Sequence, residues 1–239
     1  MTWSIAALDP ATGALGIAIA TRSLAVGASC PHVRSRIGAV STQSFTNRYL
    51  APAVLDALER GLSPADAVCA ALVGDEGEGI RQLHVVDRLG RTASHTGRHC
   101  VEWCGSVSAP GVSVAGNMLR GEDVVRRTLD AFLAAEELPF ALRLLHAMEA
   151  GEAAGGDRRG RQSAALRIHR DELFADCDLR VDDHPEPLAE LRRLLSLWLP
   201  DADARRLAAP RRSDPSGFTD IDAIERSWIE RGLELRFRR

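Results

Sequence analysis

The second residue of the chain combines two groups that together can attack an amide bond. Thr2 follows the initiator methionine, and a small residue at this position is the usual condition for methionine removal. Removal leaves a hydroxyl and a free α-amine on one residue, and an α-amine titrates near ~8, so it can accept the hydroxyl proton. The sequence therefore predicts Thr2 as a catalytic nucleophile whose base is its own amine. The alternative is an ordinary strand residue.

All 30 of the basic Lys and Arg residues are arginines, so the chain contains no lysine. Schiff-base lysines, Ser-Lys dyads and the P-loop lysine each need an amine, and a guanidinium group does not lose its proton. These chemistries are excluded. Amine chemistry in this chain must come from the α-amine at the N-terminus.

A glycine-rich loop at 155–163 gathers charged residues between an expected helix and an expected strand. It contains Asp157, Ser163 and three arginines within four positions, Arg158 and Arg161 among them. Because the arginine fork matches a carboxylate, we predict that Arg22, Arg158 and Arg161 bind a substrate carboxylate. The alternative is a loop whose charges pair with one another and with solvent.

Amide side chains stand at the ends of two expected strands. Gln43 and Asn47 end the third strand, and Asn117 follows a later one. Such amides could line an oxyanion hole or bind substrate, and we predict this role for all three. The alternative role is to cap turns.

The sequence gives only weak signals for a metal or a cofactor. Asp182, Asp183 and His184 have suitable side chains, but three consecutive residues seldom converge on one ion. A second group of possible ligands consists of His95, His99, Cys100 and Cys104. It is a weak zinc signal, because its two cysteines are not accompanied by a second cysteine pair. No Gly-x-Gly-x-x-Gly motif follows a strand. We therefore expect no metal and no cofactor.

Hydrophobic periodicity predicts the elements that position these residues. Along the chain, the expected strands come singly or in pairs and the expected helices mostly come in pairs. Strands therefore group with strands and helices with helices, and the two do not alternate strictly. This order excludes a doubly wound or barrel fold and indicates an α+β protein. The expected strands are 3–8, 15–20, 37–43, 81–87, 91–95, 112–116 and 163–169, and the expected helices are 49–60, 63–73, 122–135, 138–149 and 187–199.

Length and charge set the class of protein. The chain has 239 residues, which is long enough to bury one substantial core. Its net charge of −3 means that it lacks the excess of positive charge that would attract it to nucleic acid or to an anionic membrane. No window resembles a membrane span or a signal peptide, and five irregularly spaced cysteines indicate reduced thiols. We expect a cytoplasmic protein that binds neither nucleic acid nor membrane.

Several segments closely resemble a bacterial family known as domain of unknown function 1028. They are residues 2–5, 16–22, 34, 36–43, 155–166 and 178–184, and the likeness extends from Thr2 to about Leu195. The family is grouped with the Ntn (N-terminal nucleophile) hydrolases, which cleave amide bonds through an acyl-enzyme. The resemblance implies a four-layer αββα sandwich whose first strand presents the nucleophile. We expect this domain at 1–199 and a helical extension at 200–239.

The resemblance also implies roles for individual residues. By their order in the chain, Asp157 and Ser163 resemble the acidic and hydroxyl residues that orient the terminal amine in proteasome-like members. By rough spacing, Arg34 stands where those members have a lysine that tunes the amine. Since arginine cannot accept a proton, Arg34 is expected only to hold charge or to bind a carboxylate.

Together these features predict an amidohydrolase that cleaves a small amide or peptide-like metabolite. A non-catalytic ligand-binding or structural protein on the same scaffold is the alternative, and an internal nucleophile such as Cys30 or Ser41 is a third. We also expect a homo-oligomer, a dimer or higher. Exposed strand edges often pair in such sandwiches, and the apolar positions of the extension, 218, 221, 224, 228 and 229, need a surface to cover.

Overall fold

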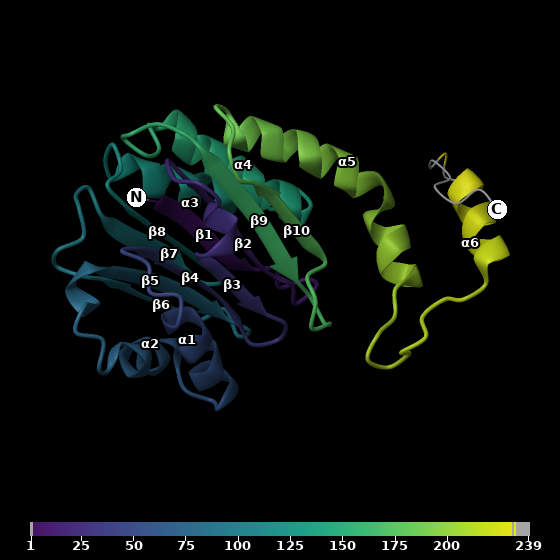
Figure 1. Ribbon diagram of the computed structural model, residues 1–239, viewed down its shortest axis with the longest axis horizontal. Coiled ribbons are helices and arrows are strands. Elements are labelled where there is room, and N and C mark those ends of the chain that lie inside the picture. Colours follow the sequence, from purple (N-terminus) through teal and green to yellow (C-terminus); the bar gives the residue numbers. More distant parts are fainter. Residues whose placement is uncertain (1, 231, 233–239) are drawn as a thin grey trace. The chain divides into compact units, whose positions relative to one another are not determined.

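The computed structural model describes residues 2–230 and residue 232, which fall into two compact units that meet between Arg193 and Leu194. The first unit contains a six-stranded antiparallel sheet in the order β10-β9-β2-β1-β8-β7 (Figure 1). The strands are β1 (Thr2–Leu8), β2 (Leu15–Thr21), β7 (Gly105–Ala109), β8 (Val112–Asn117), β9 (Ser163–His169) and β10 (Cys177–Val181). The N-terminal strand β1 is therefore central, with β2 on one side and β8 on the other.

A second antiparallel sheet packs face to face with the first. Its order is β3-β4-β5-β6, with β3 (Pro31–Arg34), β4 (Gly38–Ser44), β5 (Arg81–Asp87) and β6 (Thr92–Thr96). Apolar side chains from both sheets meet between them, including Ala6, Ile17, Ala39 and Val86. Burying these faces against each other is the main apolar contribution to this half of the core.

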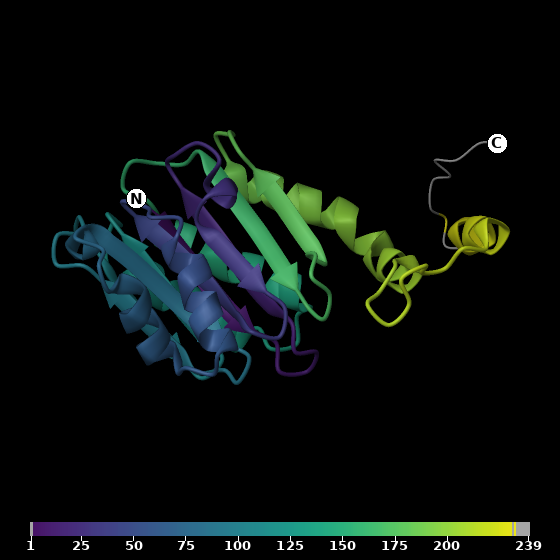
Figure 2. The ribbon, with the colours of Figure 1, turned by 60° about the horizontal axis from the view of Figure 1, so that its bottom comes forward.

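Two pairs of helices cover the outer faces of the sheets. Helices α1 (Leu50–Glu59) and α2 (Pro64–Leu72) pack on the second sheet, and α3 (Asp123–Ala134) and α4 (Phe140–Ala153) pack on the first (Figure 2). Gly151 lets α4 pack closely against β1, because a Cβ at this position would lie only 2.8 Å from the indole nitrogen of Trp3. The four layers confirm the αββα sandwich.

The strands that periodicity missed all lie at sheet edges. They are β3, β7 and β10, and most of their residues are only partly buried. An edge strand is not covered by neighbours on both sides, so it needs fewer apolar residues and carries a weaker pattern. All the expected strands and helices are present, and most of their ends are shifted by only a few residues. The exceptions are α4 and α5, which continue beyond their expected C-terminal ends.

The last long helix differs from the expected one. Helix α5 (Pro187–Ala208) continues through Pro200 instead of ending at Leu199, and the division into two compact units falls within it, after Arg193. The change of composition at Pro200 predicts an end at residue 199, and a proline inside a helix also removes one main-chain hydrogen bond. Here the helix accommodates Pro200 and makes another two turns.

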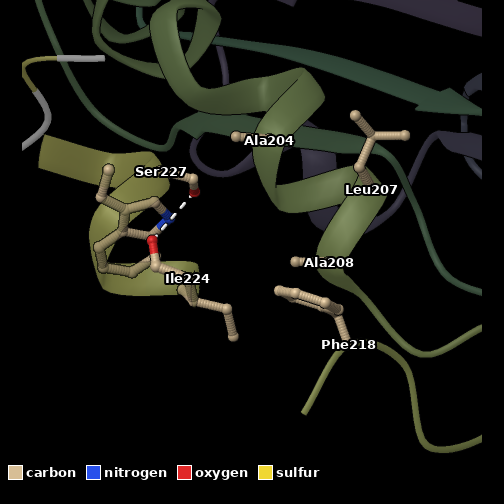
Figure 3. A pocket seen from close by; sticks show the side chains of 7 residues that line it. Ala204, Leu207, Ala208, Phe218, Ile224 and Ser227 are labelled. Carbon is tan, nitrogen blue, oxygen red and sulfur yellow. Dashed lines mark hydrogen bonds between the residues drawn. The ribbon is translucent and has the colours of Figure 1, made fainter. Parts of the chain in front are cut away.

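The second unit, from Leu194 onward, consists of the end of α5 and helix α6 (Ile221–Glu230). An apolar pocket lies between them (Figure 3), lined by Ala204, Leu207, Ala208, Phe218, Ile224, Ser227 and Trp228. Ile221 and Ile229 stay exposed, so the extension covers its apolar face only in part. The homo-oligomer stays a prediction. Within the described residues, no helix is both long enough and apolar enough to cross a membrane.

Candidate active site

Thr2 lies at the start of the central strand, at one end of the first sheet. It pairs with Asn117 across the β1–β8 ladder, and its hydroxyl donates to the hydroxyl of Thr21, at the end of β2, over 3.4 Å. Only 5% of the residue is exposed. The fold thus holds Thr2 between two strands, with the hydroxyl of Thr21, a residue that the sequence does not single out, within hydrogen-bond distance of its own.

Three buried amides converge beside Thr2. The side-chain nitrogens of Gln43 and Asn117 each lie 3.5 Å from the Thr2 carbonyl oxygen, and each donates a shorter bond to Gln82 Oε1, at 2.8 and 2.9 Å. Each of the three amides is at most 2% exposed. Gln43 and Asn117 are therefore brought to Thr2 as a pair, through Gln82.

The polar contacts continue between the two sheets, away from Thr2. Ser4 donates to Gln43 Oε1 at 2.8 Å and lies 2.7 Å from Nε2 of His84, whose Nδ1 lies 3.1 Å from the Ser113 hydroxyl. The His84 ring therefore connects Ser4 with Ser113, with one ring nitrogen at each hydroxyl. Burial lowers the pKa of His84 from 6.5 to about 3, so this ring is neutral at physiological pH.

The chain turns sharply just after two of the three amides. Ser44 follows Gln43 with φ 70°, and Met118 follows Asn117 with φ 56°. The left-handed region costs a residue other than glycine about 1–2 kcal/mol. Such conformations persist only where the surroundings hold them, and they concentrate at functional sites.

The loop 155–163 lies at the same end of the sheet. The side chain of Asp157 is fully buried and accepts from the backbone N–H groups of Arg22, at 2.8 Å, and Arg159, at 2.9 Å. Ser163 pairs with Thr21 across the β2–β9 ladder. Its hydroxyl donates to Ser23 O at 2.6 Å and accepts from the Val26 N–H at 3.1 Å. Both side chains hold the main chain next to Thr21.

The arginines at this end differ in their partners. Arg161 pairs with Glu152 and Glu186, so its charge is neutralised, and these carboxylates raise the pKa of its guanidinium. Arg22 donates to the amide oxygen of Gln162 at 2.8 Å, and Arg158 donates to the main-chain oxygen of Glu102 at 3.1 Å. Both bonds are to neutral acceptors.

Two predicted site residues lie away from Thr2 and have other partners. Arg34 is at the far end of β3 and forms ion pairs with Asp56 and Glu59 of α1, at 2.8 and 2.7 Å. Asn47 donates to Asp75 at 3.1 Å and accepts from the Tyr49 N–H at 3.1 Å, as a turn-capping side chain does. The structure does not bring either side chain to Thr2.

The internal nucleophiles considered from the sequence are both enclosed. Burial raises the pKa of the Cys30 thiol, which disfavours the reactive thiolate. Ser41 is fully buried and donates to Gln43 Oε1 at 3.0 Å. Its hydroxyl belongs to the polar layer between the sheets, so neither group resembles an accessible nucleophile.

The metal-ligating residue types do not cluster. Asp182 pairs with Arg180, Asp183 accepts from Gln162, and the ring of His184 accepts from the Glu186 N–H. Over the described part of the chain, no three His, Cys, Asp or Glu side chains are arranged to hold an ion. The five cysteines are free thiols.

Comparison with known proteins shows a strong similarity to a family of unknown function. A family model described as a family of unknown function, DUF1028, matches residues 2–191. The crystal structure of protein SPO2555 from Silicibacter pomeroyi, which carries the same family description, is 34% identical with a TM-score of 0.85. The match covers 92% of this chain and 96% of that one. No curated protein is significantly similar in sequence.

Two further solved structures are much more distant. Anbu (ancestral beta-subunit) from Yersinia bercovieri is 11% identical with a TM-score of 0.43. An Anbu (Gly-1) mutant from Hyphomicrobium sp. strain MC1 is 16% identical with a TM-score of 0.41. Both matches cover 86% of this chain and 97% of the other. Scores this low carry no argument about function.

Proposed function

We propose, from the premise that this chain belongs to the family of unknown function DUF1028, that it is an amidohydrolase whose nucleophile is the hydroxyl of Thr2. One observation carries the proposal. Thr2 begins the central strand, with the Thr21 hydroxyl 3.4 Å from its own and the amides of Gln43 and Asn117 directed at its carbonyl. Buried polar groups that hold a residue carrying both a hydroxyl and an α-amine are suited to nucleophilic catalysis.

The reaction would follow from removal of residue 1. The Thr2 hydroxyl oxygen adds to the substrate carbonyl carbon while its proton passes to the Thr2 amine. The tetrahedral intermediate collapses, the C–N bond breaks, and the amine leaving group takes the proton. Water then hydrolyses the Thr2 ester, which releases the acid and restores the hydroxyl. In this scheme the side chains of Asp157 and Ser163 act indirectly, by holding the chain beside Thr21.

The proposal is tested by measuring the intact mass of protein purified from its native host, before and after incubation with a β-lactone. Before incubation we expect a mass that lacks one methionine residue. After incubation we expect one added acyl group, because only Thr2 would carry both a hydroxyl and an amine. Thr2→Ala should gain no adduct, whereas Thr2→Ser should still react. A retained methionine together with no adduct would exclude the Thr2 mechanism.

We further propose that the substrate carries a carboxylate. Arg22 follows Thr21 on one side of Thr2, and Arg158 lies in the loop whose main chain contacts Met118, on the other side. Both guanidinium groups donate to neutral oxygens, so both retain a positive charge for a ligand. Arg161, with two carboxylate partners, is less suited to this role.

A pair of probes tests this substrate class. Wild-type protein should be acylated faster by a β-lactone that bears a carboxylate than by its neutral methyl ester. Arg158→Gln should lower that preference about tenfold, since it removes one charge-assisted bond, and should leave the rate with the ester unchanged. Arg60→Gln, at an exposed residue that caps the C-terminal end of α1, is the control. Equal wild-type rates with both probes would contradict the proposal.

A second candidate is a non-catalytic binding protein on the same scaffold. The observation that favours it is that the Asp157 carboxylate and the Ser163 hydroxyl are already bonded to main-chain groups, and that Thr2 is only 5% exposed. This candidate predicts binding of a carboxylate ligand without acylation. The intact-mass experiment separates the two.

A further inference from the structure

We propose that Gln82 is a positioning residue that sets the orientation of Thr2 through two other amides. The inference rests on the proposed function for its chemical meaning, but the geometry that carries it stands on its own. Gln82 is fully buried on β5, in the opposite sheet from Thr2, and its amide oxygen bonds to Gln43 and Asn117, which in turn contact Thr2. Its effect must therefore be transmitted by its neighbours.

One oxygen atom connects the two neighbours. Gln82 Oε1 accepts from Gln43 Nε2 at 2.8 Å and from Asn117 Nδ2 at 2.9 Å. The same two nitrogens lie 3.5 Å from the Thr2 carbonyl oxygen. Asn117 has two amide protons, one for Gln82 and one for Thr2, whereas Gln43 Nε2 also lies 3.2 Å from Ala115 O, so its second proton is shared between Ala115 O and Thr2 O. Without this acceptor, neither amide would be held toward Thr2 in the same way.

Gln82 itself is held by three groups from three strands. Its Nε2 lies 2.8 Å from Gly116 O on β8, 3.0 Å from Thr96 Oγ1 on β6 and 3.3 Å from Gly105 O on β7. These acceptors fix which end of the amide is nitrogen and aim the oxygen at Gln43 and Asn117. The side chain therefore links both sheets to one point.

The contact of the two amides with the Thr2 carbonyl oxygen matters because this carbonyl belongs to the peptide plane that contains the Thr2 Cα. Two donors on the carbonyl oxygen restrict rotation of this plane, and with it the directions of the amine and the hydroxyl. In the proposed reaction both groups must face the same carbonyl carbon, and small misplacements are costly in rate. The groups that orient Thr2 are thus distinct from the groups of Thr2 that would react with the substrate.

The sequence allows this carbonyl to be observed alone. Of the four tryptophans, only Trp3 follows a threonine. Protein labelled with carbonyl-¹³C threonine and ¹⁵N tryptophan should therefore give one carbonyl-to-amide correlation in an NMR spectrum, from Thr2 and Trp3. We expect Gln82→Met to move this signal and to speed exchange of the Trp3 amide proton. Thr96→Val, a milder change that removes one anchor of Gln82, should move it less in the same direction.

Ser113→Ala is the matched control, because Ser113 is buried in the same polar layer and contacts His84 but not the three amides. It should leave the Thr2 signal in place even if stability falls. An unmoved signal in folded Gln82→Met, or in Thr96→Val if the first variant does not fold, would overturn the inference. An equal movement in Ser113→Ala would also overturn it.

The β-lactone reaction then separates this inference from the proposed function. Gln82→Met should slow acylation of Thr2 about 10- to 100-fold and change the pH at which the rate is half-maximal. If the variant moves the NMR signal while wild-type Thr2 fails to react, the proposed function is wrong and the positioning of Thr2 remains. If wild type reacts and Gln82→Met reacts equally with the same pH profile, the positioning role is wrong.

Discussion

Replacing Asp157 with alanine should lower the free energy of unfolding by about 3 kcal/mol. The buried carboxylate accepts from the backbone N–H groups of Arg22 and Arg159, and alanine would leave both without an acceptor. The Arg159 guanidinium also loses a partner at 3.1 Å, but it is 40% exposed and contributes little. Urea denaturation at pH 7 measures the change.

Two variants make this prediction specific. Asp157→Asn keeps one acceptor oxygen and should lose less stability than Asp157→Ala. Asp178→Ala is the matched control, since its carboxylate is 40% exposed and pairs with Arg167 at 3.5 Å, a contact that contributes less than about 1 kcal/mol. If Asp157→Ala and Asp178→Ala were equally stable, the carboxylate would not be holding the loop to β2.

The stability of the protein should fall in mild acid because of His84. Its pKa is about 3 in the folded protein and near 6.5 when unfolded, so between these values the unfolded chain binds the proton and the folded chain does not. The contribution is complete above pH 6.5 and is lost as the pH falls toward 3, by about 1.4 kcal/mol per unit. At pH 5 the loss should be about 2 kcal/mol.

The comparison of pH 7 with pH 5 should be made by urea denaturation of wild type and His84→Gln. The variant should lose about 2 kcal/mol less between the two pH values. His169, whose pKa burial lowers to about 4, acts in the same direction and remains in both proteins. His146→Gln, on the exposed side of α4, should behave like wild type. Equal losses in wild type and His84→Gln would show that His84 is not the cause.

The fold follows from the sequence wherever apolar residues mark a buried face. The hairpins and the four helices that cover the sheets are recognisable because each buries a regular stripe against the core. Short edge strands such as β3 and β10 are set by pairing with a distant neighbour, which local pattern does not contain. The same holds for α5, whose passage through Pro200 contradicts the local rule.

The site was predictable only in part. Thr2, Gln43 and Asn117 were found from position and from strand ends, and the structure brings these three together. Gln82 and His84 were missed, although they left a signal. They alternate with Leu83 and Val85 along β5, so one face of an otherwise apolar strand is polar. Such alternation usually marks a solvent-facing side, and only the second sheet turns it into a buried layer.

The place of β1 in the sheet also bears on when the N-terminus can be processed. Its partner residue in β8 lies 115 positions later in the chain, and β8 cannot close on β1 before it has been made. At synthesis rates of about 5–20 residues per second, that delay is roughly 6–23 seconds. Afterwards Thr2 is enclosed. Any enzyme that trims the chain back to Thr2 therefore has its best opportunity during translation.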